Sequence, residues 1–268
     1  MYTIDSGTGV LTPTSPATVP TGFFPQGIAI DPFGRFVYTA NSDDNTVSMF
    51  TVNQTTGVLT PTIPPAIAAG WSPGGIAVDP LGKFVYVTNQ DDDTVSMYTV
   101  NSTTGILTPT SPATVPTGLS PFQITVDPSG KFAYVPNTYD FRNTVSEYTV
   151  SPSTGVLTPT GTATAGNQPT FVAIDPSSRF AFVVNRQDNT ISAYSINPSN
   201  GNLDPIGTTP TGGAPFRATV DPSGKFVYVA NESGSISIYG LNSAGTLTAA
   251  GELATPNAAY AISVVSNK

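Results

Sequence analysis

The chain has 268 residues, with 9 Lys and Arg residues against 17 Asp and Glu residues and a formal net charge of −8. This acidic balance disfavours nucleic acid and anionic membrane surfaces as partners. The sequence has no cysteine and no histidine. Disulfides, thiol nucleophiles and cysteine metal sites are therefore excluded, and the usual general base is missing. No apolar run approaches a membrane span and no signal peptide pattern is visible, so we predict no membrane insertion.

The N-terminal residues match segments that recur later in the chain. Met1–Ile4 resembles Met49–Val52, and Leu11–Gly22 is identical in sequence to Leu107–Gly118. The chain thus opens inside a repeat, at the position of its third strand.

The first complete repeat contains four predicted strands. Gly27–Ile30 is a short apolar run, a Pro-x-Gly turn follows Asp31, and Phe36–Tyr38 completes a β-hairpin. Thr46–Val52 alternates in polarity as a strand does. Val58–Pro61 is the fourth strand, and its proline suits the edge of a sheet, where no donor is needed.

The hairpin motif occurs five times, and its copies begin at Asp31, Asp79, Asp127, Asp175 and Asp221. The spacings are 48, 48, 48 and 46 residues. Four short antiparallel strands at this period are typical of one propeller blade. Because the aspartates recur so faithfully, we interpret them as turn residues that bond the backbone rather than as one active site.

The second strand of every repeat carries a pair of aromatic residues, which we predict to fill the space between blades. These residues are Phe36, Tyr38, Phe84, Tyr86, Phe132, Tyr134, Phe180, Phe182, Phe226 and Tyr228.

The chain ends with a segment, Ala261–Val264, that matches the first strand of a repeat. We therefore predict an all-β fold: a single domain, 1–268, forming a six-bladed β-propeller of four-stranded antiparallel blades. Residues 1–24 and 251–268 together would form the closing blade, which is incomplete because it lacks a second strand. A truncated start, a slot filled by another chain and a rearranged pairing are the three explanations left open.

Departures from the repeat at the predicted channel mouth identify candidate ligand-binding residues. The first strand of each blade lines the channel of a propeller, and ligands often bind at its mouth. The candidates there are Gln26, Phe122, Gln123, Phe171, Phe216, Arg217 and Tyr260. Arg217 is the only cation at the two positions compared, which favours a small anionic or carbohydrate ligand. The alternative is drift between repeats, with Arg217 meeting a nearby carboxylate.

Two loops are further candidates. The third repeat has a loop two residues longer than its counterparts, and Tyr139, Phe141 and Arg142 in it would form a binding patch or pack on themselves. The acidic loops Asp43–Asn45 and Asp91–Asp93 suggest calcium, but turn chemistry explains them better. We assign no metal site, no cofactor and no catalytic residue.

The motifs also carry a family resemblance over essentially the whole chain. Tyr86-Val87-Thr88-Asn89, the Asp-Pro-x-Gly-Lys-Phe turns and the Thr-Gly-x-Leu-Thr ends resemble the lactonase-like or YVTN-type β-propeller family. That family includes 6-phosphogluconolactonase-like proteins and many surface proteins, and its members usually have seven blades.

Two functions follow as hypotheses. The near-identical repeats and the polar, cysteine-free composition favour a non-enzymatic scaffold or binding protein, extracellular or on the cell surface. Such a chain would self-associate through its termini, where the closing blade leaves strands unpaired. The alternative is a lactone hydrolase of the 6-phosphogluconolactonase-like type. It would act on an anionic sugar lactone, with Arg217 as anchor and a carboxylate-activated water as nucleophile. Glu232 is the glutamate nearest the predicted mouth.

Overall fold

The computed structural model describes residues 1–5, 7–139 and 143–264. They divide into two compact units, Met1–Val115 and Pro116–Lys268, which are called unit 1 and unit 2. Within the described residues there are 22 strands and no helix. Accordingly, this part of the chain contains no helix that could span a bilayer.

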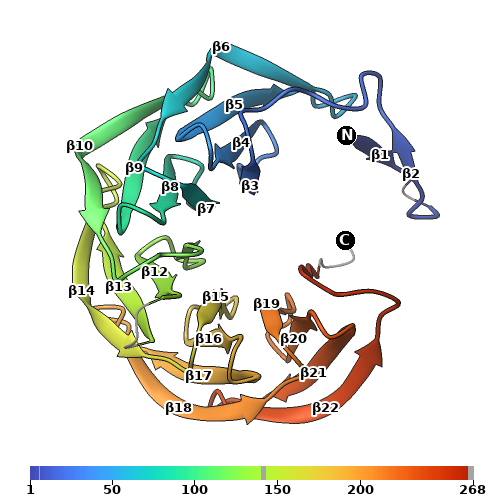
Figure 1. The fold of residues 1–268 in the computed structure, drawn as a ribbon, viewed down its shortest axis with the longest axis vertical. Helices are drawn as coiled ribbons and strands as arrows, with labels where there is room; N and C mark the ends of the chain where they lie inside the picture. Colours follow the sequence, from blue (N-terminus) through green and yellow to red (C-terminus); the bar gives the residue numbers. More distant parts are fainter. Residues whose placement is uncertain (6, 140–142, 265–268) are drawn as a thin grey trace. The chain divides into compact units, whose positions relative to one another are not determined.

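Unit 1 contains one two-stranded and two four-stranded antiparallel sheets (Figure 1). The two-stranded sheet pairs β1 (Tyr2–Ile4) with β2 (Leu11–Pro13). The first four-stranded sheet consists of β3 (Pro25–Ile30), β4 (Phe36–Asn41), β5 (Thr46–Val52) and β6 (Leu59–Ala68). The second consists of β7 (Pro73–Val78), β8 (Phe84–Asn89), β9 (Thr94–Val100) and β10 (Leu107–Pro116).

Unit 2 contains three four-stranded antiparallel sheets, each with its strands in chain order. The first consists of β11 (Thr125–Val126), β12 (Phe132–Asn137), β13 (Thr144–Val150) and β14 (Leu157–Thr164). The second consists of β15 (Pro169–Ile174), β16 (Phe180–Asn185), β17 (Thr190–Ile196) and β18 (Leu203–Pro210). The third consists of β19 (Pro215–Val220), β20 (Phe226–Asn231), β21 (Ser235–Leu241) and β22 (Leu247–Ala254).

The prediction of an all-β fold with four antiparallel strands per repeat is confirmed. The proline-bearing fourth strand lies at the edge of its sheet, as Pro61 in β6 and Pro159 in β14 illustrate. The prediction of a strand at Ala261–Val264 is wrong, because these residues are irregular. Elsewhere a first strand pairs with the second strand of its own hairpin, and no described residue pairs with this segment.

The repeated aspartate closes each hairpin turn through its side chain. Asp127 is typical: its Oδ1 accepts the N–H groups of Lys131 and Phe132, both at 2.8 Å, and its Oδ2 accepts the N–H of Ser129 at 3.0 Å. The turn is thereby bonded internally although the aspartate is buried. This confirms the interpretation of the aspartates as turn residues.

Three of the aromatic pairs, those that begin at Phe36, Phe132 and Phe180, pack against a glycine turn of the following sheet within the same unit. In unit 2 the ring of Phe132 lies so close to Gly201 that a Cβ there would be 2.3 Å from it, and Gly201 has a φ of 80°. The hydroxyl of Tyr134 donates to the carbonyl of Gly201 at 2.7 Å. Glycine is needed at this turn both for its backbone conformation and for the close approach of the ring.

The predicted burial of the aromatic pairs is confirmed for four repeats and wrong for the fifth. Phe132 is 5% exposed, whereas Phe226 is 41% exposed and Tyr228 is half-buried. The same residues thus meet different surroundings, because no glycine turn covers the ring of Phe226 within unit 2.

Candidate functional site

Two neighbouring first strands of unit 2 each begin with a β-bulge. In β15 the register passes from Pro169 opposite Asn185 to Phe171 opposite Val184, so Thr170 is the extra residue. In β19 the same irregularity makes Phe216 the extra residue. A bulge redirects side chains at the end of a strand, and bulges are frequent next to functional sites. The hydroxyl of Thr170 donates to the carbonyl of Phe216 at 2.9 Å and ties the two bulges together.

The bulges gather most of the predicted ligand-binding residues into one cluster. The ring of Phe216 makes edge-to-face contacts with Phe122 and Tyr260, at centroid distances of 5.6 and 5.7 Å. The guanidinium of Arg217 lies over the ring of Phe171, 5.4 Å from its centroid. We call Phe122, Phe171, Phe216, Arg217 and Tyr260 the Arg217 cluster.

The two other predicted residues are not brought into this cluster. Gln123 follows Phe122 outside the strand ladder and makes none of the ring contacts. Gln26 belongs to β3 of unit 1, where it is the bulged residue between Pro25 and Gly27.

Arg217 is a half-buried cation with no acidic partner among residues 1–5, 7–139 and 143–264. Among the described residues it forms no ion pair, and its one recorded side-chain contact is the ring of Phe171. Burial lowers the pKa of its guanidinium below the usual value. A cation removed from water without a counter-charge is costly, so an anion arriving beside it would be stabilised. The alternative in which Arg217 meets a carboxylate of its own is not realised in this part of the chain.

An ion pair bridges the two sheets that begin with β15 and β19. The guanidinium of Arg186 donates to both carboxylate oxygens of Glu232, with Nε–Oε1 at 2.9 Å and Nη2–Oε2 at 2.7 Å. A third nitrogen donates to Oε1 of Gln168 at 3.3 Å. The hydrogen bond to Glu232 raises the pKa of Arg186, and the hydroxyl groups of Tyr260 and Tyr139 contribute in the same direction. Tyr260, a member of the Arg217 cluster through its contact with Phe216, therefore also lies within electrostatic range of Arg186.

Arg186 was not among the residues that the sequence singled out. It directly follows Asn185 at the end of β16, and Glu232 follows Asn231 at the end of β20. The corresponding residues of the other repeats are Ser42, Gln90 and Thr138. Applying the comparison between repeats to this position would have found the ion pair, since two of five copies carry opposite charges there.

The predicted loop patch is partly described. Tyr139 is exposed, in agreement with the prediction of an accessible aromatic residue. Phe141 and Arg142 lie outside the described residues.

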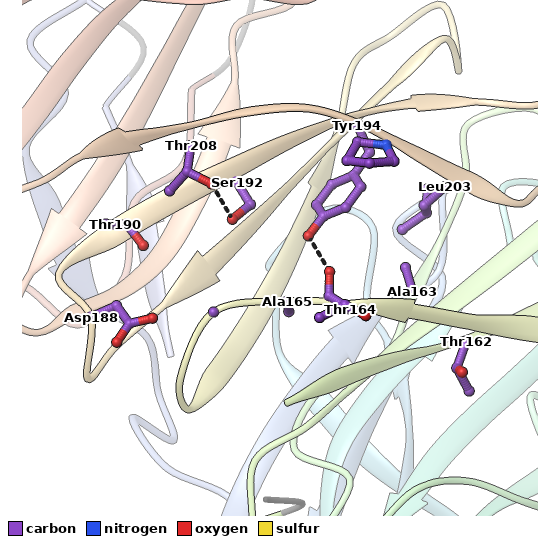
Figure 2. A pocket seen from close by; sticks show the side chains of 12 residues that line it. Thr162, Ala163, Thr164, Ala165, Asp188, Thr190, Ser192, Tyr194, Leu203 and Thr208 are labelled. Carbon is purple, nitrogen blue, oxygen red and sulfur yellow. Dashed lines mark hydrogen bonds between the residues drawn. The ribbon is translucent and has the colours of Figure 1, made fainter. Parts of the chain in front are cut away.

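A cavity of about 790 Å³ lies between β14 and the strands β17 and β18 (Figure 2). The hydroxyl of Tyr194 donates to the carbonyl of Thr164 at 2.7 Å there, and Ser192 bonds Thr208 at 3.2 Å. Grooves with the same construction recur beside Tyr148 in unit 2 and beside Phe50 in unit 1. A groove that the repeat generates in several copies is a product of sheet packing, so we do not place the individual site of this protein in it.

Aspartates of the acidic loops accept hydrogen bonds from backbone N–H groups of an earlier segment of the chain. Asp44 accepts the N–H of Phe23, Asp92 that of Trp71 and Asp188 that of Asn167, each at 2.7 Å. Across the described ranges no three acidic residues come together as metal ligands would. These three bonds run to a segment 21 residues earlier in the chain, so they differ from the local turn bonding that the sequence indicated.

The family model described as lactonase, seven-bladed β-propeller, matches residues 1–66, 60–140 and 137–259. No curated protein sequence matches the chain. Among solved structures, a candidate 6-phosphogluconolactonase from Bacteroides fragilis shares 20% identity at a TM-score of 0.82, covering 96% of this chain and 77% of the other. A second, from Bacteroides uniformis, shares 24% identity at 0.83, covering 97% and 79%. The periplasmic gluconolactonase of Pseudomonas aeruginosa shares 21% identity at 0.79, covering 96% and 77%.

These matches correct the functional hypothesis that the sequence favoured. A non-enzymatic scaffold was expected because the repeats are nearly identical, but the family model that spans most of the chain describes lactonases. Similarity between repeats lies in turns and strands, and it left the variable positions at the strand ends free to carry a site. The chain belongs to the lactonase family of β-propellers.

Proposed function

We propose that this protein hydrolyses a lactone that carries an anionic group. The observation that carries the proposal is Arg217, a half-buried guanidinium with no acidic partner among the described residues, which lies over the ring of Phe171 in a member of the lactonase family. Arg217 would anchor the anionic group of the substrate, and Phe171, Phe216 and Tyr260 would contact its apolar edges.

Glu232 is the carboxylate best placed to activate water. Its two oxygens are held by Arg186, which fixes the direction of their remaining lone pairs. A water molecule bonded to Glu232 would lose a proton to the carboxylate while its oxygen attacks the lactone carbonyl carbon. The ring C–O bond would then break, and the alkoxide would take that proton from Glu232. Arg186 would stabilise the negative charge on the carbonyl oxygen in the tetrahedral intermediate.

The test measures lactone opening in wild type and in Arg217→Ala, Glu232→Gln and Lys225→Gln. Acid release from glucono-δ-lactone and from its 6-phosphate would be followed at constant pH, with the spontaneous rate subtracted. We expect Arg217→Ala to raise KM for the phosphorylated substrate by about tenfold or more. Glu232→Gln should lower kcat by about 100-fold, the usual range for losing a general base.

Lys225→Gln removes a positive charge from an exposed turn away from the Arg217 cluster and should leave both constants unchanged. Wild-type protein that does not accelerate opening of either lactone above the spontaneous rate would refute the proposed function. Activity that survives both Arg217→Ala and Glu232→Gln would refute the assignment of these residues.

We also propose the finer features expected from the sequence. These are a six-bladed arrangement, an extracellular or surface location, and self-association. The closing blade would take residues 1–24 and the chain after Ala254, because residues 251–254, which the sequence also assigned to it, belong to β22. The repeat count supports the first, and the polar, cysteine-free composition supports the second. Exposed apolar side chains on the sheets, such as Ile28 and Phe226, support self-association.

A further inference from the structure

We infer that unit 2 carries a second ligand site, for a small oxyanion, at the hairpin turns of its first two sheets. A cavity of about 460 Å³ lies between the turn that precedes β12 and the turn that precedes β16. Its polar lining comes from Ser129, Lys131, Ser177, Ser178, Arg179 and Ser195. The volume is in the range of small-molecule sites. None of these residues belongs to the Arg217 cluster, so the inference does not depend on the proposed function.

Two cations line this cavity without ion pairs. In the described parts of the chain, neither Lys131 nor Arg179 is paired with a carboxylate. Arg179 donates from Nε to Oγ of Ser177 at 3.0 Å and lies 4.9 Å from the ring centroid of Phe180. Its two terminal nitrogens are left to bond a ligand. An oxyanion accepts hydrogen bonds well from a guanidinium and an ammonium together.

The arginine at the corresponding position of the first repeat already has a carboxylate partner, unlike Arg179. Arg35 forms an ion pair with Asp31 at 2.9 Å and also donates to the carbonyl of Ser102 at 3.3 Å. Its guanidinium stacks over Phe33, which occupies the place of Ser177. Where serine replaces this aromatic residue, its hydroxyl bonds the turn aspartate, and the arginine is released from that carboxylate.

The turn aspartates do not form ion pairs with the two cations, because their oxygens already accept hydrogen bonds from their own turns. Oδ1 of Asp175 accepts the N–H groups of Arg179 and Phe180, both at 2.7 Å, and its Oδ2 accepts both the N–H and the hydroxyl of Ser177. Both Asp175 and Asp127 are buried. Since Ser177 gives its proton to Asp175, its oxygen is left as an acceptor for hydroxyl groups of a ligand.

Ser178 adds a strained residue at the same place. It has a φ of 56°, whereas the other four repeats have glycine with positive φ here, at Gly34, Gly82, Gly130 and Gly224. A serine in this conformation costs backbone energy, and such residues tend to persist at functional sites. Its oxygen accepts the N–H of Ser129 at 3.2 Å, so its own proton is free to bond an oxyanion.

The ligand that matches this lining is small, negatively charged and hydroxylated. Lys131, Arg179 and Ser178 donate to a phosphate or carboxylate group, while Ser177 accepts from hydroxyl groups. The net charge of −8 disfavours a long polyanion as the source of that group. A phosphate monoester or a carboxylate of a short polyol combines both features.

The experiment is calorimetric titration of the Arg217→Ala variant of the full chain, so that an anion held at the Arg217 cluster does not contribute. The probes are inorganic phosphate, glycerol 3-phosphate and glycerate, at constant ionic strength in chloride. We expect saturable binding of one equivalent, weakened at least tenfold by Lys131→Gln and by Arg179→Gln. Comparing glycerol 3-phosphate with glycerate decides between phosphate and carboxylate as the preferred group.

Two further variants make the result specific. Ser178→Gly restores the residue of the other repeats, so it should retain or improve the melting temperature yet weaken binding several-fold. Lys83→Gln changes the corresponding turn in unit 1 and should leave the affinity unchanged. Absence of saturable binding would overturn the inference, as would equal weakening by Lys83→Gln and Lys131→Gln, which would indicate diffuse charge attraction.

Discussion

A single buried carboxylate distinguishes the third strand of one repeat from its copies. Glu147 occupies the position of Met49 and Met97, and its Oε1 accepts the N–H of Leu203 at 2.7 Å. At the same place in unit 1 the thioether sulfur of Met49 lies 3.3 Å from the N–H of Leu107. Burial raises the pKa of Glu147 above its usual value. The third repeat thus holds a titratable group where the two repeats before it have a methionine.

Glu147 makes the stability of the protein depend on pH. Because its pKa is higher in the folded than in the unfolded chain, its contribution is most favourable at low pH and is lost as pH rises through the folded value. We expect Glu147→Met to remove this loss and to raise the free energy of unfolding at neutral pH by about 1–3 kcal/mol. Urea unfolding at mildly acidic and mildly alkaline pH measures it, with the exposed Glu252→Met as control. An unchanged pH profile would contradict the expectation.

At the scale of the sheet, the second strand stabilises the fold according to what lies against it. Phe132 in β12 is buried against Gly201, while the equivalent Phe226 in β20 is largely exposed. Phe132→Ala should therefore lower the free energy of unfolding by about 3–5 kcal/mol, and Phe226→Ala by under about 1 kcal/mol. Chemical denaturation of the two variants measures the difference. Equal losses would show that Phe226 is covered in solution.

The first strand of a sheet provides the apolar surface against which the aromatic pair of a neighbouring sheet packs. In unit 1 the side chain of Ile76 is 7% exposed and packs in the cluster that contains Phe36 and Tyr38. Ile28, at the same position of β3, is 71% exposed. An exposed aliphatic face of this kind is normally covered by the aromatic pair of another sheet.

For the whole molecule, we propose that these exposed faces mediate self-association, by a route different from the strand addition at the termini that the sequence suggested. The aromatic face at Phe226 and Tyr228 of one copy would cover the Ile28 face of a second copy, as Phe36 and Tyr38 cover Ile76 within unit 1. Sedimentation velocity over a wide range of protein concentration should show species larger than the monomer, and Ile28→Lys should abolish them without lowering the melting temperature. A monomer at every concentration, for both proteins, would rule the proposal out.

The sequence predicted what is local and missed what depends on neighbours. The strands and turns were predictable because the Asp-Pro-x-Gly motif and the alternation of Thr46–Val52 specify hairpins by themselves. Two predictions were wrong: the strand at Ala261–Val264 and the burial of Phe226. Residues that match the other repeats form a strand or become buried only where a partner segment lies against them, and the local sequence does not supply that partner. Within the site, Arg217 was found as a departure from the repeat, whereas the pairing of Arg186 with Glu232 depends on the register between two sheets.

The glycine turn that receives the ring of Phe132 has a consequence for the gene. The same contact joins neighbouring sheets within each unit, as with Phe36 on Gly105 in unit 1 and Phe180 on Gly245 in unit 2. A recombination event between the DNA of two repeats of one unit would add or delete one repeat of about 48 residues, and the new junction would keep the same type of contact. The number of repeats can thus change in one genetic step. Arg186, Arg217 and Glu232 would be inherited together, because they lie on two adjacent repeats.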